Sequence, residues 1–181
     1  MAMIYFARHG ETEWNTLHKI CGRTDVPLTE KGREEAKLLS EKIKSEKIAL
    51  KLILHSPLKR AAETAKIVSE NLGIKAEVEP LLIERDCGIF EGKLNTSDEF
   101  LKAKQQICND YGGGESMLRV SQRIFDLLDK LTKIKTDERS LLLIGHNGIA
   151  RSVEAYFNPH LKTDEFIHFF LKNCELRRYE F

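Results

Sequence analysis

Short apolar runs alternate along this chain with longer stretches in which apolar residues recur every three or four positions. Short runs of this kind are typical of buried strands, and the longer spacing is typical of amphipathic helices that pack on a sheet. The apolar runs at residues 4–7, 52–54 and 141–144 predict buried strands, and alternating segments at residues 74–78 and 174–181 predict two more.

The helical pattern fills the segments between those strands. Thr29 is predicted to cap a first helix, and Ser56-Pro57 is predicted to begin a second helix that ends at Gly73. Three further helices are expected, a polar one at residues 98–110 and two others at 116–131 and 149–157. Because strands and helices alternate, we expect a single α/β domain over residues 1–181, with a mainly parallel central sheet and helices on both faces.

The charge balance narrows the range of partners. The 181 residues include 29 Lys and Arg against 28 Asp and Glu, so the formal net charge is only +1. This balance argues against a general nucleic-acid-binding surface, which needs a basic stripe. No apolar run approaches the roughly 20 residues that span a bilayer. We therefore expect neither a nucleic acid nor a membrane as a partner.

The cysteines and the first residues bear on the cellular compartment. The four cysteines are far apart and form no CxxC pair, at Cys21, Cys87, Cys108 and Cys174. This pattern favours reduced thiols over a zinc site or a disulfide framework. The first apolar run stops at Arg8-His9, so it lacks the features of a signal peptide. A cytoplasmic location is the expectation.

Charged and polar side chains follow the three buried strands at the point where each strand ends. Arg8 and His9 follow the first strand, Arg60 comes shortly after the second, and His146 follows the third. Ligands bind beyond the carboxyl ends of the strands in an open parallel sheet, so these side chains are predicted to share one edge. The result would be a small cationic pocket suited to a phosphate group.

Each residue type fits a step of phosphoryl transfer. Arginine binds phosphate oxygens with a planar, permanently charged fork, and a neutral imidazole is a competent nucleophile. Glu84 follows an apolar stretch that would shield it from water, and it is the candidate general acid. Glu91 is a nearby alternative, which we rank below Glu84. The sequence has no HExxH helix, and two arginines would repel a dication, so we expect no metal.

Five blocks of the sequence together resemble the histidine phosphatase superfamily, the phosphoglycerate mutase-like enzymes. The blocks are the opening RHGETEWN at residues 8–15 with GRTDVPLT at 22–29, SPLKRAAETA at 56–65, ERDCGIFEG at 84–92, GES at 114–116 and GHNG at 145–148. They occur in the order of the family and cover nearly the whole chain. The short phosphatase branch, with α-ribazole phosphatases and broad-specificity phosphatases, is the most similar part of that family.

The resemblance implies a role for each matching residue. His9 would be the nucleophile that carries a phosphohistidine, and Glu84 would protonate the leaving group and later activate water. The phosphate pocket would be completed by Arg8, Arg60, His146 and Asn15. Main chain or small side chains at Cys21, Gly22 and Asn147 would approach the substrate. Asn147 and Cys87 depart from the common pattern, in which glycine and an aromatic residue stand at these positions.

The function expected from the sequence is hydrolysis of a small phosphate monoester, with no cofactor. A cofactor-dependent phosphoglycerate mutase would use the same catalytic residues. The stretch between Glu84 and His146 is shorter than in the mutases of this superfamily, and this favours a phosphatase. A phosphate-binding module without turnover is a more distant alternative. The physiological substrate and the oligomeric state stay open.

Overall fold

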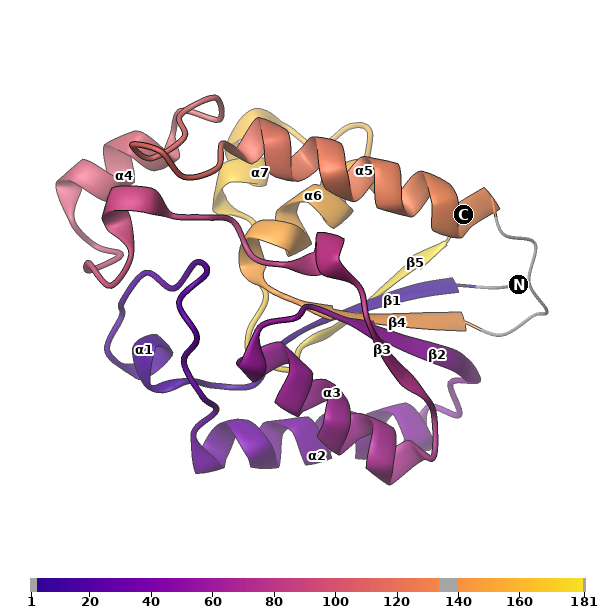
Figure 1. Cartoon of the computed structure of the whole chain (residues 1–181). Helices are drawn as coiled ribbons and strands as arrows, with labels where there is room; N and C mark the ends of the chain where they lie inside the picture. The colour runs from indigo at the N-terminus through magenta and orange to yellow at the C-terminus, as the bar shows by residue number, and fades with distance from the viewer. Residues whose placement is uncertain (1–2, 134–139, 181) are drawn as a thin grey trace.

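The computed structural model describes residues 3–133 and 140–180, which contain one five-stranded sheet in the order β3-β2-β4-β1-β5 (Figure 1). Its strands are β1 (Met3–Arg8), β2 (Leu50–His55), β3 (Ala76–Val78), β4 (Ser140–Gly145) and β5 (Leu176–Glu180). The first four strands run parallel, and β5 pairs antiparallel with β1. The mainly parallel sheet predicted from the sequence is confirmed.

Helices cover both faces of the sheet, as the alternation of elements predicted. They are α1 (Glu13–Thr16), α2 (Glu30–Ser45), α3 (Lys59–Leu72), α4 (Asp98–Lys104), α5 (Met117–Lys133), α6 (Asn147–Phe157) and α7 (Thr163–His168). Figure 1 shows α2 and α3 on one side of the strands and α5 and α6 on the other. No helix within the two described ranges is long and apolar enough to cross a membrane.

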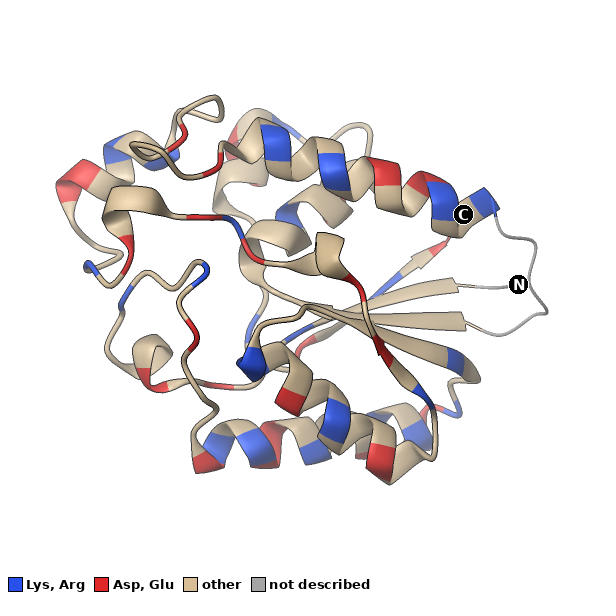
Figure 2. Ribbon diagram, in the orientation of Figure 1, with Lys and Arg blue, Asp and Glu red and all other residues tan. Residues whose placement is uncertain are grey.

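The faces of the central strands explain their continuous apolar runs. Along β1, Ile4 and Phe6 pack against α5 and α6, whereas Tyr5 and Ala7 pack against α2 and α3. A strand that is covered on both faces needs apolar side chains at every position. Figure 2 shows the consequence, because the charged residues lie mainly on the helices and loops while the central strands are almost free of charge.

Two of the predicted helix ends are confirmed, and one predicted cap is wrong. The Thr29 side chain accepts a hydrogen bond from Gly32 N at the start of α2, and Gly73 ends α3 in the left-handed region with φ of 66°. Ser56 does not cap α3, because the N-cap is Leu58. The hydroxyl of Ser56 instead lies against His146, so this residue belongs to the edge of the sheet rather than to the helix.

Other boundaries differ from the sequence pattern by a few residues. The helix predicted over 98–110 ends at Lys104, and residues 105–116 form turns in which Tyr111 and two glycines have positive φ. The helix predicted from residue 149 begins at Asn147, and α1 and α7 were not predicted. The strand predicted over 174–181 is β5, and residue 181 lies outside the described residues.

A third apolar cluster lies beyond the carboxyl edge of the sheet. It contains Ile20, Cys87, Phe90, Ala103 and Tyr111. The rings of Phe90 and Tyr111 meet edge to face, with 5.0 Å between centroids. The cluster thereby joins the loop around residue 20, the segment after Glu84 and helix α4 into one unit. This unit forms a wall above the edge of the sheet.

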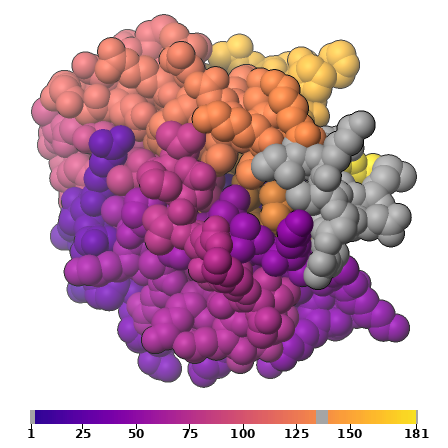
Figure 3. Space-filling model, turned by 45° about the vertical axis from the view of Figure 1, so that its right-hand side comes forward, coloured from indigo at the N-terminus to yellow at the C-terminus, as the bar shows by residue number. Residues whose placement is uncertain are grey.

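Helix α5 supports the segment that follows β3. In the space-filling view the atoms of α5 lie against those of this segment (Figure 3). The Arg123 side chain donates hydrogen bonds to the carbonyl oxygens of Leu81 and Ile83, and its Nε lies 2.8 Å from Glu115 Oε1. Because Glu84 is the next residue along the chain, Arg123 fixes the backbone that carries the predicted general acid.

Candidate active site

Three strand ends deliver the predicted catalytic residues to one edge of the sheet. Arg8 pairs in register with Gly145, and His9 N donates to Gly145 O over 3.0 Å. Ser56 N donates to Ile144 O over 3.0 Å, which brings the end of β2 to the same level. The parallel register therefore places His9, Ser56 and His146 side by side, as the sequence predicted for the two histidines.

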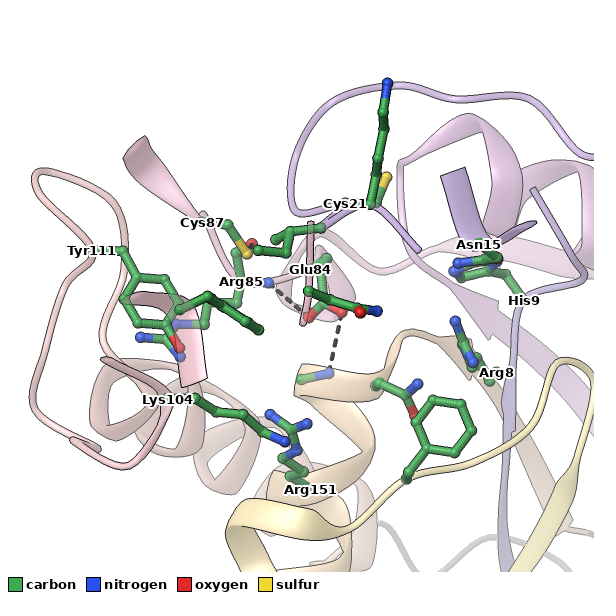
Figure 4. A pocket seen from close by; sticks show the side chains of 17 residues that line it. Arg8, His9, Asn15, Cys21, Glu84, Arg85, Cys87, Lys104, Tyr111 and Arg151 are labelled. Atoms are coloured by element: carbon green, nitrogen blue, oxygen red, sulfur yellow. Dashed lines mark hydrogen bonds between the residues drawn. The ribbon is translucent and has the colours of Figure 1, made fainter. Parts of the chain in front are cut away.

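A pocket of about 250 Å³ opens at this edge. Six of the predicted site residues line it, namely Arg8, His9, Asn15, Cys21, Glu84 and Asn147 (Figure 4). Arg60 and His146 are 0% and 1% exposed and lie behind this lining. Gly22 also lies outside the lining, and its carbonyl oxygen accepts a hydrogen bond from Arg60 Nη2.

His9 is held as a neutral imidazole with one ring nitrogen available for attack. Its Nδ1 lies 2.6 Å from Gly10 O, so this nitrogen carries the proton and donates it to the carbonyl. The tautomer leaves Nε2 with a lone pair. Burial, followed by the charges of Arg60 and Arg8, holds the pKa of His9 well below its ordinary value. These are the properties of a nucleophilic histidine.

His146 lies behind the pocket lining and is hydrogen-bonded to the end of β2. Its Nε2 lies 2.7 Å from Ser56 Oγ, and that hydroxyl also accepts from Leu58 N. If the hydroxyl donates to Nε2, the proton of the neutral ring lies on Nδ1. This Nδ1 is buried and has no partner among the described residues. Burial is the main cause that lowers the pKa of His146, so the ring is neutral.

Arg8 and Arg60 are two buried cations whose charges act on both histidines. The terminal nitrogens of Arg60 donate to Thr24 O and Gly22 O over 2.9 and 2.7 Å. Arg8 Nη1 donates to Leu171 O over 3.0 Å, and burial lowers the pKa of Arg8 to about 10, which leaves it charged at neutral pH.

Neither of these arginines forms an ion pair with a described residue, and the Nε atoms of both are buried without a partner in that part of the chain. Buried charges are normally paired, because an isolated charge away from water is costly. The arrangement of Arg8 and Arg60 beside two neutral histidines therefore indicates a site for an anion.

Glu84 is held by two backbone donors at the opposite side of the pocket floor. Its Oε1 accepts from Arg85 N over 2.8 Å, and its Oε2 accepts from Gly148 N over 3.1 Å. Gly148 lies in the first turn of α6, so the carboxyl group meets the N-terminus of that helix. A Cβ at Gly148 would lie 2.4 Å from Glu84 Oε1, which explains the glycine. Glu84 is 8% exposed and faces the pocket.

Glu91, the alternative acid, is engaged elsewhere. Its carboxylate accepts hydrogen bonds from Gly22 N, Arg23 N and Thr24 Oγ1 over 3.2, 2.9 and 2.8 Å. These bonds hold the loop whose carbonyl oxygens bind Arg60. A Cβ at Gly22 would lie 2.1 Å from Glu91 Oε1, so the glycine is needed for this contact. Glu91 thus anchors the loop behind Arg60 and does not line the pocket.

The remaining predicted residues line the pocket through side chains that are already fixed. Asn15 Oδ1 accepts from Thr12 N over 3.0 Å and from Asn173 Nδ2 over 3.3 Å. Asn147 Oδ1 accepts from Leu171 N over 2.9 Å. Burial raises the pKa of Cys21 to about 11, so it presents a protonated thiol rather than a nucleophilic thiolate.

Sequence reasoning missed several residues of this site. Ser56 comes directly after a buried strand, as His9 does. Its hydrogen bond with His146 was not foreseen, because a serine at this position also suits a helix cap. Arg151 lines the pocket three positions after Gly148, a helical spacing that could have identified it. Lys104 lines the pocket because α4 folds over it, and no local signal in the sequence indicates this.

A metal ion finds no ready set of ligands here. Within the described part of the chain, no group of three or more His, Cys, Asp or Glu side chains is arranged to hold one. The available donors are two histidines beside two arginines, whose charges would oppose a dication.

Comparison with known proteins identifies the family. The sequence matches the profile of the histidine phosphatase superfamily (branch 1) over residues 4–181. The chain belongs to this superfamily. The match includes every strand end that delivers a residue to the pocket, so the histidine phosphatase family accounts for both the sheet and the site.

Proteins similar to this chain in sequence or in structure carry both mutase and phosphatase names. A protein named probable phosphoglycerate mutase GpmB from Yersinia enterocolitica is 31% identical over 191 residues, which cover 100% of this chain and 86% of that protein. A mycobacterial glucosyl-3-phosphoglycerate phosphatase has a TM-score of 0.84 at 24% identity, covering 98% of this chain and 89% of that chain. A phosphoserine phosphatase from Entamoeba histolytica has a TM-score of 0.83 at 24% identity, covering 98% and 90%.

Proposed function

We propose that this histidine phosphatase hydrolyses a small phosphate monoester through a phosphohistidine on His9. The observation that carries the proposal is the buried pair Arg8 and Arg60, without carboxylate partners among the described residues, beside a neutral His9. A phosphate dianion matches the charge and the fork geometry of two arginines. Its phosphorus would then lie in reach of the His9 lone pair.

The reaction has two steps: the phosphoryl group first moves from the substrate to His9 and then from His9 to water. His9 Nε2 attacks phosphorus, the bond from phosphorus to the ester oxygen breaks, and Glu84 gives its proton to the departing alkoxide. Arg8, Arg60 and the Nδ1–H of His146 hold the charge on the equatorial oxygens. Glu84, now a carboxylate, takes a proton from water, whose oxygen attacks phosphorus and releases inorganic phosphate and free His9.

The fixed tautomer of His9 supports the first step. Because Nδ1–H donates to Gly10 O, the positive charge that forms on the ring during attack strengthens this hydrogen bond. The bond also prevents the ring from turning Nε2 away from the pocket. His9 is thus oriented before the substrate binds, which lowers the entropic cost of the attack.

A phosphoglycerate mutase is the second candidate, and the name of the Yersinia relative favours it. The mutase would use the same His9 and Glu84, but it must return the phosphoryl group to an organic acceptor before water attacks. Between Glu84 and His146, the short α4 is the only helix of the described residues that lines the pocket, and this limited cover favours hydrolysis. The names of the two structural neighbours refer to phosphatases as well.

Turnover and phosphoenzyme trapping test the proposal together. The protein is incubated with p-nitrophenyl phosphate without added metal, beside the variants His9→Asn and His168→Asn. His168 is an exposed histidine whose Nδ1 meets only Asp164, so it is a matched control. We expect turnover and acid-labile, base-stable protein phosphate in the wild type and in His168→Asn, with both lost in His9→Asn.

Two results would overturn the proposal. The first is the absence of hydrolysis across a broad panel of phosphate monoesters, and the second is protein-bound phosphate that persists in His9→Asn. A conversion of 3-phosphoglycerate to 2-phosphoglycerate that is faster than its hydrolysis would instead establish the mutase.

A further inference from the structure

The pocket contains a second pair of cations apart from the phosphate site. Lys104, at the end of α4, and Arg151, on α6, both line its wall. Figure 4 shows the ends of these two side chains close together, with Glu84 lying between them and His9. The mechanism proposed above uses neither of them.

The fold holds both side chains on the far side of Glu84 from the phosphate site. Arg151 lies three positions after Gly148, so the two residues share one face of α6 about one turn apart, or roughly 5 Å along the axis. Gly148 N binds Glu84, and Arg151 therefore lies beyond the acid on the side of the leaving group. Ala103 is buried in the third apolar cluster, which holds the end of α4 and the adjacent Lys104 over the pocket.

Neither cation is satisfied by the protein. Arg151 donates Nε to Phe169 O over 3.1 Å but forms no ion pair within the described residues, and Lys104 forms no hydrogen bond or ion pair with any of them. Burial, and then the charge of Arg151, lowers the pKa of Lys104. Two adjacent cations repel each other, and an anion between them would remove that repulsion.

Arg85, a third cation of the lining, shows the contrast. Its guanidinium stacks on the Tyr111 ring at 3.5 Å, and it donates to Glu115 O and Asn109 O over 2.6 and 2.7 Å. These contacts give Arg85 a structural role that occupies its donors. Lys104 and Arg151, in contrast, keep terminal donors that no described side chain or carbonyl group uses.

We propose that Lys104 and Arg151 form a second anion subsite, which selects phosphate monoesters whose leaving group itself carries an acidic group. This inference rests on the proposed phosphomonoesterase function. The phosphate lies against Arg8 and His9, the ester oxygen faces Glu84, and a carboxylate or a second phosphate on the leaving group reaches the subsite. The short separation of the two sites restricts the substrate to a small metabolite.

Matched substrate pairs test the inference. O-phosphoserine and O-phosphoethanolamine differ by one carboxylate, and a propanediol bisphosphate differs from propyl phosphate by one phosphate. The ratio of kcat/KM within each pair is measured for the wild type, Lys104→Met, Arg151→Met and the control Lys102→Met. Lys102 is an exposed lysine on the same helix that does not line the pocket. Because each ratio is taken within one protein, partial unfolding of a variant cancels.

We expect the wild type and Lys102→Met to favour the acidic member of at least one pair by about tenfold or more, and the pair identifies the acidic group. Lys104→Met and Arg151→Met should each reduce that preference about tenfold, through KM. A ratio near one in both pairs, or a preference that survives both variants, would overturn the subsite. Calorimetric binding of the same pairs to His9→Asn gives the comparison without turnover, so failure of hydrolysis is separated from failure of the subsite.

Discussion

The imidazole rings of His9 and His146 lie with their centroids 5.1 Å apart, tilted at 57° to each other, and each ring is hydrogen-bonded to a different neighbour. His9 donates Nδ1–H to Gly10 O, whereas His146 has Nε2 against Ser56 Oγ. His9 therefore keeps a lone pair on Nε2 beside the ring of His146. This pair is the core of the proposed chemistry, and the predictions follow from what holds it in place.

The buried neutral histidines should make stability depend on pH. The pKa values of His9 and His146 are lowered in the folded protein, so the unfolded chain binds more protons once the pH falls below about 6.5. The free energy of unfolding should then fall with the pH, by at most about 1.4 kcal/mol per pH unit for each histidine. Urea unfolding from about pH 7 to about pH 5 should show a shallower slope in His9→Asn than in the wild type. Parallel slopes would contradict the lowered pKa.

Ser56→Ala should lower kcat while the protein stays folded. Without the hydroxyl, the buried hydrogen bond that orients the His146 ring is lost, which corresponds to about a tenfold decrease in rate. The control is Ser45→Ala, whose hydroxyl meets only Lys42 O on the exposed end of α2. Steady-state kinetics with p-nitrophenyl phosphate measure the effect. Equal kcat values for the two variants would remove Ser56 from the site.

Gly148→Ala should reduce activity more than stability. The added Cβ would meet Glu84 Oε1 at 2.4 Å, so the carboxyl group must move, and we expect a loss of kcat of about a hundredfold. Gly73→Ala provides the opposite case, because its φ of 66° is strained for alanine but no atom lies within 4 Å. That variant should unfold about 1 kcal/mol more easily and keep its activity. Steady-state kinetics and urea unfolding of both variants measure these two effects. A fully active Gly148→Ala would contradict the placement of Glu84.

Arg123→Leu should affect both the fold and the acid that it positions. The side chain bonds the carbonyl oxygens of Leu81 and Ile83 and pairs with Glu115, which is 12% exposed. Loss of one partner of a largely buried ion pair costs about 3 kcal/mol. Because Arg123 acts through the backbone of Glu84, kcat should fall about tenfold while KM is unchanged.

The control for Arg123→Leu is Arg119→Leu, an exposed position one turn earlier on α5. It should change neither kcat nor the free energy of unfolding by a measurable amount. A change in KM alone for Arg123→Leu would show that the residue contacts substrate rather than the acid. Full activity of that variant per folded molecule would show that Arg123 has only a structural role.

The sequence predicted the residues that local patterns place, and it was less reliable where long-range packing decides. The strand ends at His9 and His146 were predictable because a buried strand must stop where the chain turns polar. The choice of Glu84 over Glu91 rested on block position alone. In the structure, Glu91 binds the loop at residues 22–24, and Glu84 meets the N-terminus of α6. Both relationships join segments far apart in the chain.

By itself, the sequence determined the alternating α/β fold, the edge of the sheet that carries the chemistry, and the four residues Arg8, His9, Arg60 and His146. These follow from the apolar periodicity and from the change to polar residues at the strand ends. Both signals can be seen within a few neighbouring residues of the sequence. Only the tertiary structure decided the tautomer of His9, the anchoring of Glu84, and the approach of Lys104 to Arg151. The reason is that each of these depends on partners brought together by packing across the sheet and the third apolar cluster, and the linear pattern does not encode those distances.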